Sequence, residues 1–213
     1  MADTLAQLIT KLQALLIGDA TTFTNATCTA AIRQALKDLN LAVPQHAAET
    51  LDAVSEQYEY EIAESSALTI ADVLLQGTDT YNDYNVSLPF DPYFEDDRPF
   101  FRLRNPQATG RTLIARYTMP YTINGLDSAT ASTLPALYDV VLLDGAGWRA
   151  CLVRAAGRIE TINMNADVSK NFAAMADMFK SAFYAGLANL ARRPFPRSEP
   201  SDLGWIDGWD GKY

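Results

Sequence analysis

The chain is poor in the side chains that most often carry catalysis or bind metals. Its 213 residues include one histidine, His46, and two cysteines, Cys28 and Cys151, which lie far apart in the sequence. Zinc sites need clusters of such ligands, and a Ser-His-Asp triad could use only His46, with no nucleophile elbow around the nearby serines. We therefore expect reduced structural thiols, no metal, no cofactor and no catalytic triad.

Positive charge and long apolar runs are also scarce. Seventeen Lys and Arg stand against twenty-six Asp and Glu, which gives a net charge of −9. This balance disfavours direct binding of nucleic-acid phosphates by the protein as a whole. No stretch is apolar enough to span a membrane, and the amphipathic start MADTLAQLITKLQ lacks the basic region and apolar run of a signal peptide. We expect neither membrane insertion nor secretion.

Apolar residues still make up 48% of the chain, and in four segments they recur at helical spacing. The last two segments predict a long helical hairpin, around which the rest of the chain is organised. Pro135 falls in the opening turn of this hairpin, and Arg192-Arg193-Pro194 supplies the charge and the stop expected at its end. The four predicted helices cover residues 5–17, 27–39, 134–159 and 167–193.

The middle of the chain favours β-structure. Residues 57–63 alternate polar and apolar side chains, and residues 70–75 form a short apolar run. Residues 100–104 and 111–117 flank the turn NPQATG and are predicted to pair as an antiparallel hairpin. Residues 78–98 combine turn residues, acids and aromatics, and are predicted to be a loop. The pattern predicts an α+β fold: a mainly α-helical bundle with a small antiparallel β insertion and an extended C-terminal tail.

Four consecutive regions follow from these assignments. We expect N-terminal helices in residues 1–56, the β insertion with its acidic and aromatic loop in 57–123, the long helices in 124–193, and an extended arm in 194–213. The arm holds three prolines and three glycines, yet it also carries large aromatic side chains, which disordered tails usually lack. Because such side chains often anchor interfaces, we predict that the arm docks onto a partner.

One motif invites a cofactor interpretation. Gly145, Gly147 and Ala150 form a G-x-G-x-x-A pattern after an apolar run, with Glu160 and Asp167 downstream, as in a dinucleotide-binding turn. A Rossmann domain needs further βα units, and only a helical segment and a Pro-rich tail follow. The alternative is that these small residues let another helix approach closely, and the missing units favour it.

The acidic cluster Asp91, Glu95, Asp96 and Asp97 raises the question of a metal site. Its spacing does not match an EF-hand loop, and it has no glycine at the tight-turn position. Charge runs on loops are normally solvated, so we expect a solvated loop face.

A resemblance adds information that spacing alone does not carry. Residues 116–160 resemble part of the head-to-tail adaptor (connector) proteins of tailed bacteriophages and prophages. In those proteins a strand ending in Arg-Tyr, here Arg116-Tyr117, leads through a Leu-Asp loop, here Leu126-Asp127, to the helix start Thr133-Leu134-Pro135. The segment AAIRQALKDLN, residues 30–40, is similar to their opening helices, and the order of elements matches as well.

The resemblance implies a structural virion protein without enzymatic activity. Such a protein forms a homo-oligomeric ring beneath the portal, of about twelve subunits to match it, and joins the capsid to the tail. DNA passes through the lumen without specific binding, and a negative surface suits this role because it repels phosphates. The implied partners are the portal and tail or neck proteins. The implied location is the virion neck at the head–tail junction, after assembly in the host cytoplasm.

Residues in and just before the arm are the hypothesised contacts with the portal, with aromatic anchors and arginines for acidic portal groups. Two alternatives remain: another neck or tail-completion protein, and a small nucleotide-dependent enzyme that uses the Gly145-x-Gly147 turn. The hypothesised portal contacts are Arg192, Arg193, Phe195, Arg197, Trp205, Ile206, Trp209 and Tyr213.

Overall fold

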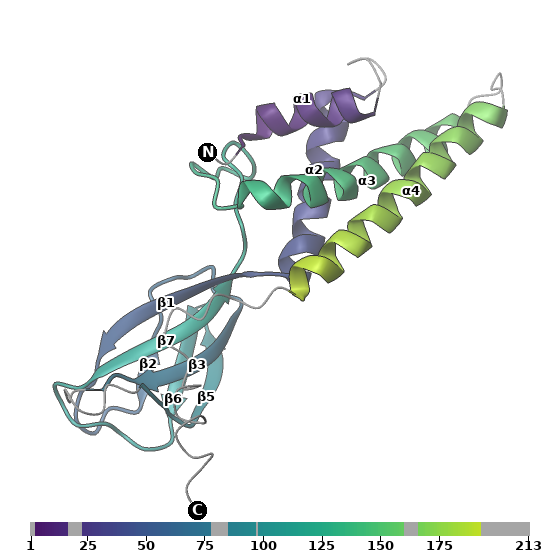
Figure 1. The fold of residues 1–213 in the computed structure, drawn as a ribbon. Coiled ribbons are helices and arrows are strands. Elements are labelled where there is room, and N and C mark those ends of the chain that lie inside the picture. The colour runs from purple at the N-terminus through teal and green to yellow at the C-terminus, as the bar shows by residue number, and fades with distance from the viewer. Residues whose placement is uncertain (1–2, 17–22, 78–84, 97, 160–165, 193–213) are drawn as a thin grey trace, which may run out of the picture.

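The computed structural model describes residues 3–16, 23–77, 85–96, 98–159 and 166–192. Within these residues four α-helices account for 44% and seven strands for 25% of the structure. Helices and strands are segregated into a helical part and a β part, which lie end to end (Figure 1). None of the described helices combines the length and the apolar character needed to cross a bilayer.

The helical part is organised around its third helix. Helix α3 packs along α4 and also contacts α1 and α2, so its middle is covered on several sides (Figure 1). Thr4 caps α1 in a capping box with Gln7, and the Thr24 hydroxyl accepts a hydrogen bond from the Thr27 N–H at the start of α2. A short 3-10 helix, Ala136–Tyr138, leads into α3. The helices are α1 Leu5–Leu15, α2 Asn25–Ala42, α3 Asp139–Ile159 and α4 Ala166–Ala191.

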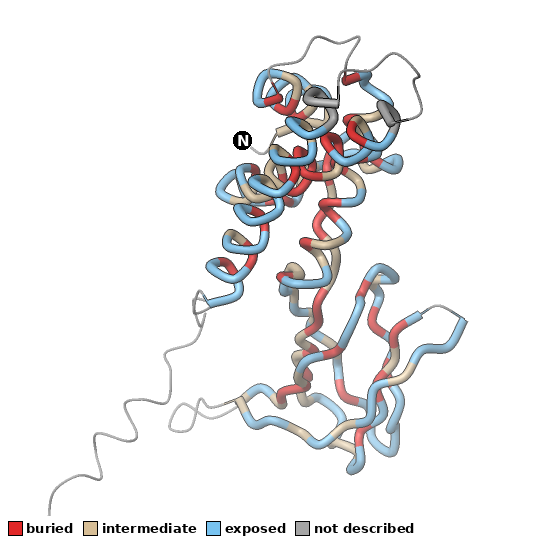
Figure 2. Tube along the Cα trace, turned by 90° about the vertical axis from the view of Figure 1, so that its right-hand side faces the viewer, coloured by how far each residue is buried: buried red, intermediate tan, exposed pale blue. Residues whose placement is uncertain are grey.

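The β part contains two antiparallel sheets. One has the strand order β1-β7-β3-β4 and the other the order β2-β6-β5. Their facing side chains form a core that shares no residue with the core of the helices, and buried residues run through both parts in Figure 2. The strands are β1 Gln45–Asp52, β2 Glu59–Glu61, β3 Thr69–Leu75, β4 Val86–Ser87, β5 Phe90–Glu95, β6 Arg98–Leu103 and β7 Thr112–Met119.

The expectation of a mainly helical bundle with a small β insertion is wrong. Strand β1 begins at Gln45, inside the region expected to hold only N-terminal helices, and β4 and β5 lie in the segment 78–98 that was predicted to be a loop. Aromatic side chains of that segment are part of the sheet, since Phe90 packs edge-on against the buried Phe101 at 6.3 Å between ring centroids. The β part therefore builds its own core.

The predicted hairpin of residues 100–104 and 111–117 is also wrong in its pairing. Strand β6 pairs with β2 and β5, whereas β7 pairs with β1 and β3. The segment between β6 and β7 thus crosses from one sheet to the other. A turn signal predicts a reversal of the chain, but packing decides which strand becomes the neighbour.

The two parts are joined by two neighbouring crossings of the chain. The first runs from α2 through Val43 and Pro44 into β1, and the second leaves β7 at Pro120. Because Gln45 pairs with Met119 at the end of the β1–β7 ladder, the two crossings lie side by side (Figure 1).

Candidate functional site

The hypothesised portal contacts fall almost entirely outside the described residues. Arg192 is the exception: it is exposed directly after the end of α4, where its N–H donates to the Ala188 carbonyl at 3.2 Å. The contact hypothesis therefore stays a prediction. The residues outside the described ranges are Arg193, Phe195, Arg197, Trp205, Ile206, Trp209 and Tyr213.

The loop of residues 120–135, which links β7 to α3, is held in one conformation by its own hydrogen bonds. Thr122 and Thr133 are bonded through backbone N–H and carbonyl at 3.0 Å and through the Thr133 hydroxyl at 2.9 Å. At the tip, Gly125, Asp127 and Ser128 adopt φ values of 87°, 49° and 67°. The left-handed region is costly for the two non-glycine residues, so surrounding contacts must fix the tip.

The same loop binds both N-terminal helices. The Leu5 N–H donates to the Asn124 carbonyl at 3.0 Å, which attaches the start of α1. Asp127 accepts hydrogen bonds from Nε of Arg33 on α2, at 2.8 and 3.1 Å to its two carboxylate oxygens. These bonds join segments that are far apart in the sequence, and periodicity offered no signal for them.

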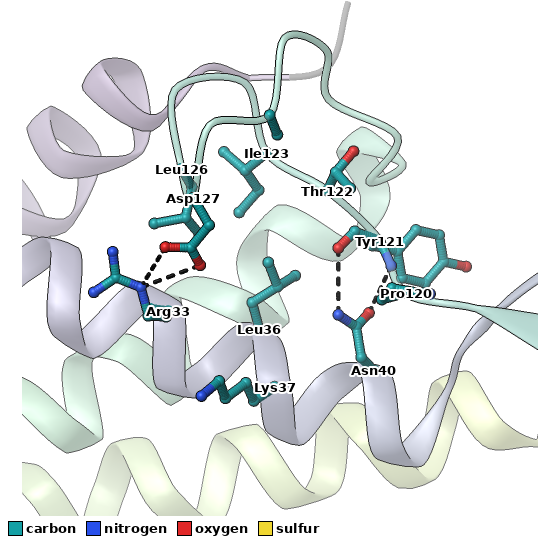
Figure 3. A pocket seen from close by; sticks show the side chains of 11 residues that line it. Arg33, Leu36, Lys37, Asn40, Pro120, Tyr121, Thr122, Ile123, Leu126 and Asp127 are labelled. Carbon is teal, nitrogen blue, oxygen red and sulfur yellow. Dashed lines mark hydrogen bonds and ion pairs between the residues drawn. The ribbon is translucent and has the colours of Figure 1, made fainter. Parts of the chain in front are cut away.

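Asn40 connects the end of α2 to the point where the chain leaves β7. Its side-chain amide accepts from the Tyr121 N–H at 2.8 Å and donates to the Tyr121 carbonyl at 3.3 Å, as Figure 3 shows. One side chain thereby satisfies both backbone groups of a buried residue. This amide pair sets the position of the second crossing relative to α2.

A hollow of about 200 Å³ lies between α2 and the loop (Figure 3). Leu36, Ile123 and Leu126 line it with apolar side chains that are 7%, 1% and 3% exposed. Lys37 is exposed at its edge and forms no ion pair within the described part of the chain, whereas the charge of Arg33 is balanced by Asp127. The hollow is therefore an apolar depression with one positive charge that no described residue neutralises.

Titratable groups near this site have structural environments. Burial, followed by the charge interaction and hydrogen bond with the Tyr138 phenol group, raises the pKa of Tyr121 to about 12, so its phenol stays protonated. Asp139 is 7% exposed at the start of α3, and burial followed by its hydrogen bond to the Asp3 carboxyl raises its pKa to about 6. Lys11 contacts Asp3 and lowers the pKa of that carboxyl. The two carboxyls thus favour a shared proton.

The glycines of the G-x-G-x-x-A pattern serve close helix packing. Both lie inside α3, away from any strand-to-helix turn, so the interpretation as a dinucleotide-binding turn is wrong. A Cβ on Gly145 would lie 2.8 Å from the Phe183 ring and 3.0 Å from the Cβ of Ala35, and one on Gly147 would lie 3.2 Å from the Phe179 ring. The alternative interpretation, that small residues admit a neighbouring helix, is confirmed.

The acidic cluster lies mainly on a strand and not on the predicted loop. Asp91 and Glu95 belong to β5, and Asp91 pairs with Arg104 at 3.1 Å, while Asp97 lies outside the described residues. Among the described residues, no group of three or more His, Cys, Asp or Glu could hold a metal ion.

The two cysteine thiols lie in the core of the helical part. Both Cys28 and Cys151 are buried and free, and burial raises the pKa of each thiol, that of Cys151 to about 11. Thiols held in the protonated form are poor nucleophiles. His46 is exposed on the edge strand β1, opposite Thr118.

Comparison with solved structures finds chains that are similar to this one at low sequence identity and low TM-score, and three of them are described here. A chain from the neck of an empty gene transfer agent (GTA) particle, computed with C6 symmetry, is 11% identical with a TM-score of 0.31, covering 77% of this chain and 87% of its own. A chain from the virion of a native GTA particle is 11% identical with a TM-score of 0.29, covering 73% and 77%. A chain from the neck of a native GTA particle, computed with C12 symmetry, is 12% identical with a TM-score of 0.29, covering 81% and 91%.

No protein-family model matches the chain, and neither does any curated protein. At TM-scores near 0.3 the solved neighbours do not define a shared fold for this chain.

Proposed function

We propose that this protein is a structural head-to-tail adaptor, a ring-forming subunit beneath the portal that joins the capsid to the tail and lets DNA pass. One observation carries the proposal: the two segments that resemble adaptor proteins, residues 30–40 and 116–160, meet in the structure. Arg33 of the first binds Asp127 of the second, and Asn40 of the first binds the backbone of Tyr121 of the second. The resembling residues thus build one continuous unit.

The helical part offers surface for contacts between subunits. Helix α4 packs on α3 and only slightly on α2, and it leaves Met178 74% exposed and Tyr184 52% exposed. Near the start of α3, Val140 is 67% exposed. Large apolar side chains in such positions supply the contact area that a ring of identical subunits requires.

The net charge of −9 suits a channel through which DNA moves. A ring of such subunits repels phosphates and gives the DNA no fixed binding positions, so transit stays fast. The role needs no catalytic group, and the thiols and carboxyls described above are buried, paired or solvated.

The terminal arm provides the first test. Deleting residues 194–213 should leave the circular dichroism spectrum and the melting temperature nearly unchanged, because it removes none of the described helices and strands, and should abolish binding to purified portal. Replacement of Ser198, Ser201 and Asp202 by alanine, which leaves every hypothesised contact in place, is the control. Portal binding that survives the full deletion would contradict the docking role of the arm.

Electron microscopy and co-purification test the rest of the proposal. The purified protein, alone and mixed with portal, should form rings that sit on one end of the portal. Co-purification with tail protein instead of portal would favour the alternative of another neck or tail-completion protein. Addition of NAD or ATP should leave the thermal melt unchanged, since a ligand that binds the folded state would raise it.

A further inference from the structure

We propose that the hollow between α2 and the loop of residues 120–135 binds the C-terminal segment 205–210 of the same chain. The proposal rests on the hollow, its charge and the sequence of the segment, and it does not depend on the role at the neck. It concerns the single subunit, before any partner binds.

The hollow has the character of a site for one large aromatic side chain. Its floor is formed by Leu36, Ile123 and Leu126, which come from two elements distant in the sequence, and its volume is about 200 Å³ (Figure 3). Small sites of this kind combine apolar walls with a few polar groups that orient the ligand. Tryptophan supplies large apolar area together with an N–H that can remain at the wet edge.

The positive charge of Lys37 at the edge of the hollow favours a ligand that carries a carboxylate next to its aromatic ring. Arg33 is already bound by Asp127, and the Asn40 amide is used by Tyr121. Lys37 is the remaining cation at the hollow, exposed and without an ion pair among the described residues. A carboxylate one or two residues from the ring would reach it across the edge.

The segment Trp205-Ile206-Asp207-Gly208-Trp209-Asp210 has this combination twice. Each tryptophan has an aspartate one or two positions later, and Gly208 separates the two pairs. Either pair can place an indole against the apolar floor and a carboxylate near the Lys37 ammonium group. Each pair supplies an apolar ring for the floor of the hollow and a charge opposite in sign to that of Lys37.

The chain can reach the hollow within one subunit. Helix α4 ends at Ala191, at the end of the helical part where α2 meets β1 (Figure 1). The residues between Arg192 and Trp205 can span about 3.3 Å each when extended, several times the width of a helix. Such a tether raises the local concentration of the segment to about millimolar, which favours docking in the same chain over capture by another.

Fluorescence of the tail tryptophans tests the proposal in the full-length protein. In a Trp148→Phe background all tryptophan emission comes from Trp205 and Trp209. At low micromolar concentration we expect acrylamide to quench this emission less than that of a free peptide of residues 201–213. Lys37→Glu should shift the docking equilibrium by about fivefold toward the quenchable form.

Matched variants make the outcome decisive. Lys170→Glu introduces the same charge change at an exposed position of α4 and should leave quenching unchanged. Pairing Lys37→Glu with Asp207→Lys and Asp210→Lys should restore protection. If Trp148→Phe does not fold, the difference between wild type and Trp205→Phe or Trp209→Phe reports the same signal.

Three results would overturn the proposal: tail tryptophans as quenchable as the free peptide, no effect of Lys37→Glu, or protection that appears only at concentrations where the protein self-associates. The last would assign the hollow to a second copy. Since none of these measurements involves portal, they leave the proposed adaptor function to its own tests.

Discussion

The carboxyl group of Asp139 makes the stability of the helical part depend on pH. Its pKa in the folded protein is raised to about 6, mainly by burial and then by Asp3, with Lys11 acting in the opposite direction. A raised pKa favours the protonated form in the folded state. The resulting stabilisation is complete below the pKa of the unfolded chain, near 3.8, and is lost as the pH rises through 6.

We therefore predict that the free energy of unfolding falls by about 1–3 kcal/mol between pH 5 and pH 7.5. Asp139→Asn keeps this position neutral and should remove most of that slope. Urea denaturation across the range measures it, with Asp177→Asn, at an exposed position of α4, as the control. An Asp139→Asn variant with the slope of wild type would show that other groups cause it.

Gly145 is a second position where one residue controls packing. Replacement by alanine gains about 1 kcal/mol of helix propensity, but the new Cβ would collide with the Phe183 ring at 2.8 Å. We predict that Gly145→Ala lowers the free energy of unfolding by about 1–3 kcal/mol, because overpacking outweighs propensity. Chemical denaturation checks this, and Gly147→Ala, with its contact at 3.2 Å, should cost less. Equal effects at both positions would argue against the packing explanation.

Among the elements, α2 and the 120–135 loop depend on Asn40 for their relative position. Asn40→Ala removes both bonds to Tyr121 and leaves its backbone groups partly buried without partners. We predict a loss of about 1–3 kcal/mol in stability and faster hydrogen exchange at the Tyr121 amide. Gln34→Ala, on the exposed face of the same helix, is the control and should change neither. Unchanged protection of the Tyr121 amide would show that Asn40 does not hold the loop against α2.

The sequence predicts the elements whose residues follow a local hydrophobic pattern. Each of the four helices buries an apolar stripe, so periodicity located α1 to α4. Strand β1 was not predicted because its sequence, QHAAETLD, forms a half-exposed edge strand with few large apolar residues. The contacts between α2 and the 120–135 loop were not predicted, because Arg33 and Asp127 are 94 residues apart in the sequence and Asn40 and Tyr121 are 81 residues apart. Contacts of that separation leave no periodic signal.

At the scale of the whole molecule, the two separate cores predict that the β part folds by itself. Its buried residues contact one another, among them Phe101, Leu113 and Ala115 with no exposed surface. A fragment of residues 44–120 should therefore give a dispersed amide NMR spectrum. Phe101→Ala in the fragment should destabilise it by about 3–5 kcal/mol and collapse the dispersion. A wild-type fragment with the narrow spectrum of an unfolded chain would show that the helical part is needed.

The paired crossings at Val43–Pro44 and Pro120 have a mechanical consequence. The two crossings leave the sheet from the paired ends of β1 and β7, so the β part is attached to the helices at one edge of that sheet and not across a broad face. The Asn40 amide, which bonds both backbone groups of Tyr121, fixes the second crossing to the end of α2. An attachment at one edge lets a change in the helical part reach the β part only through these two segments of the chain.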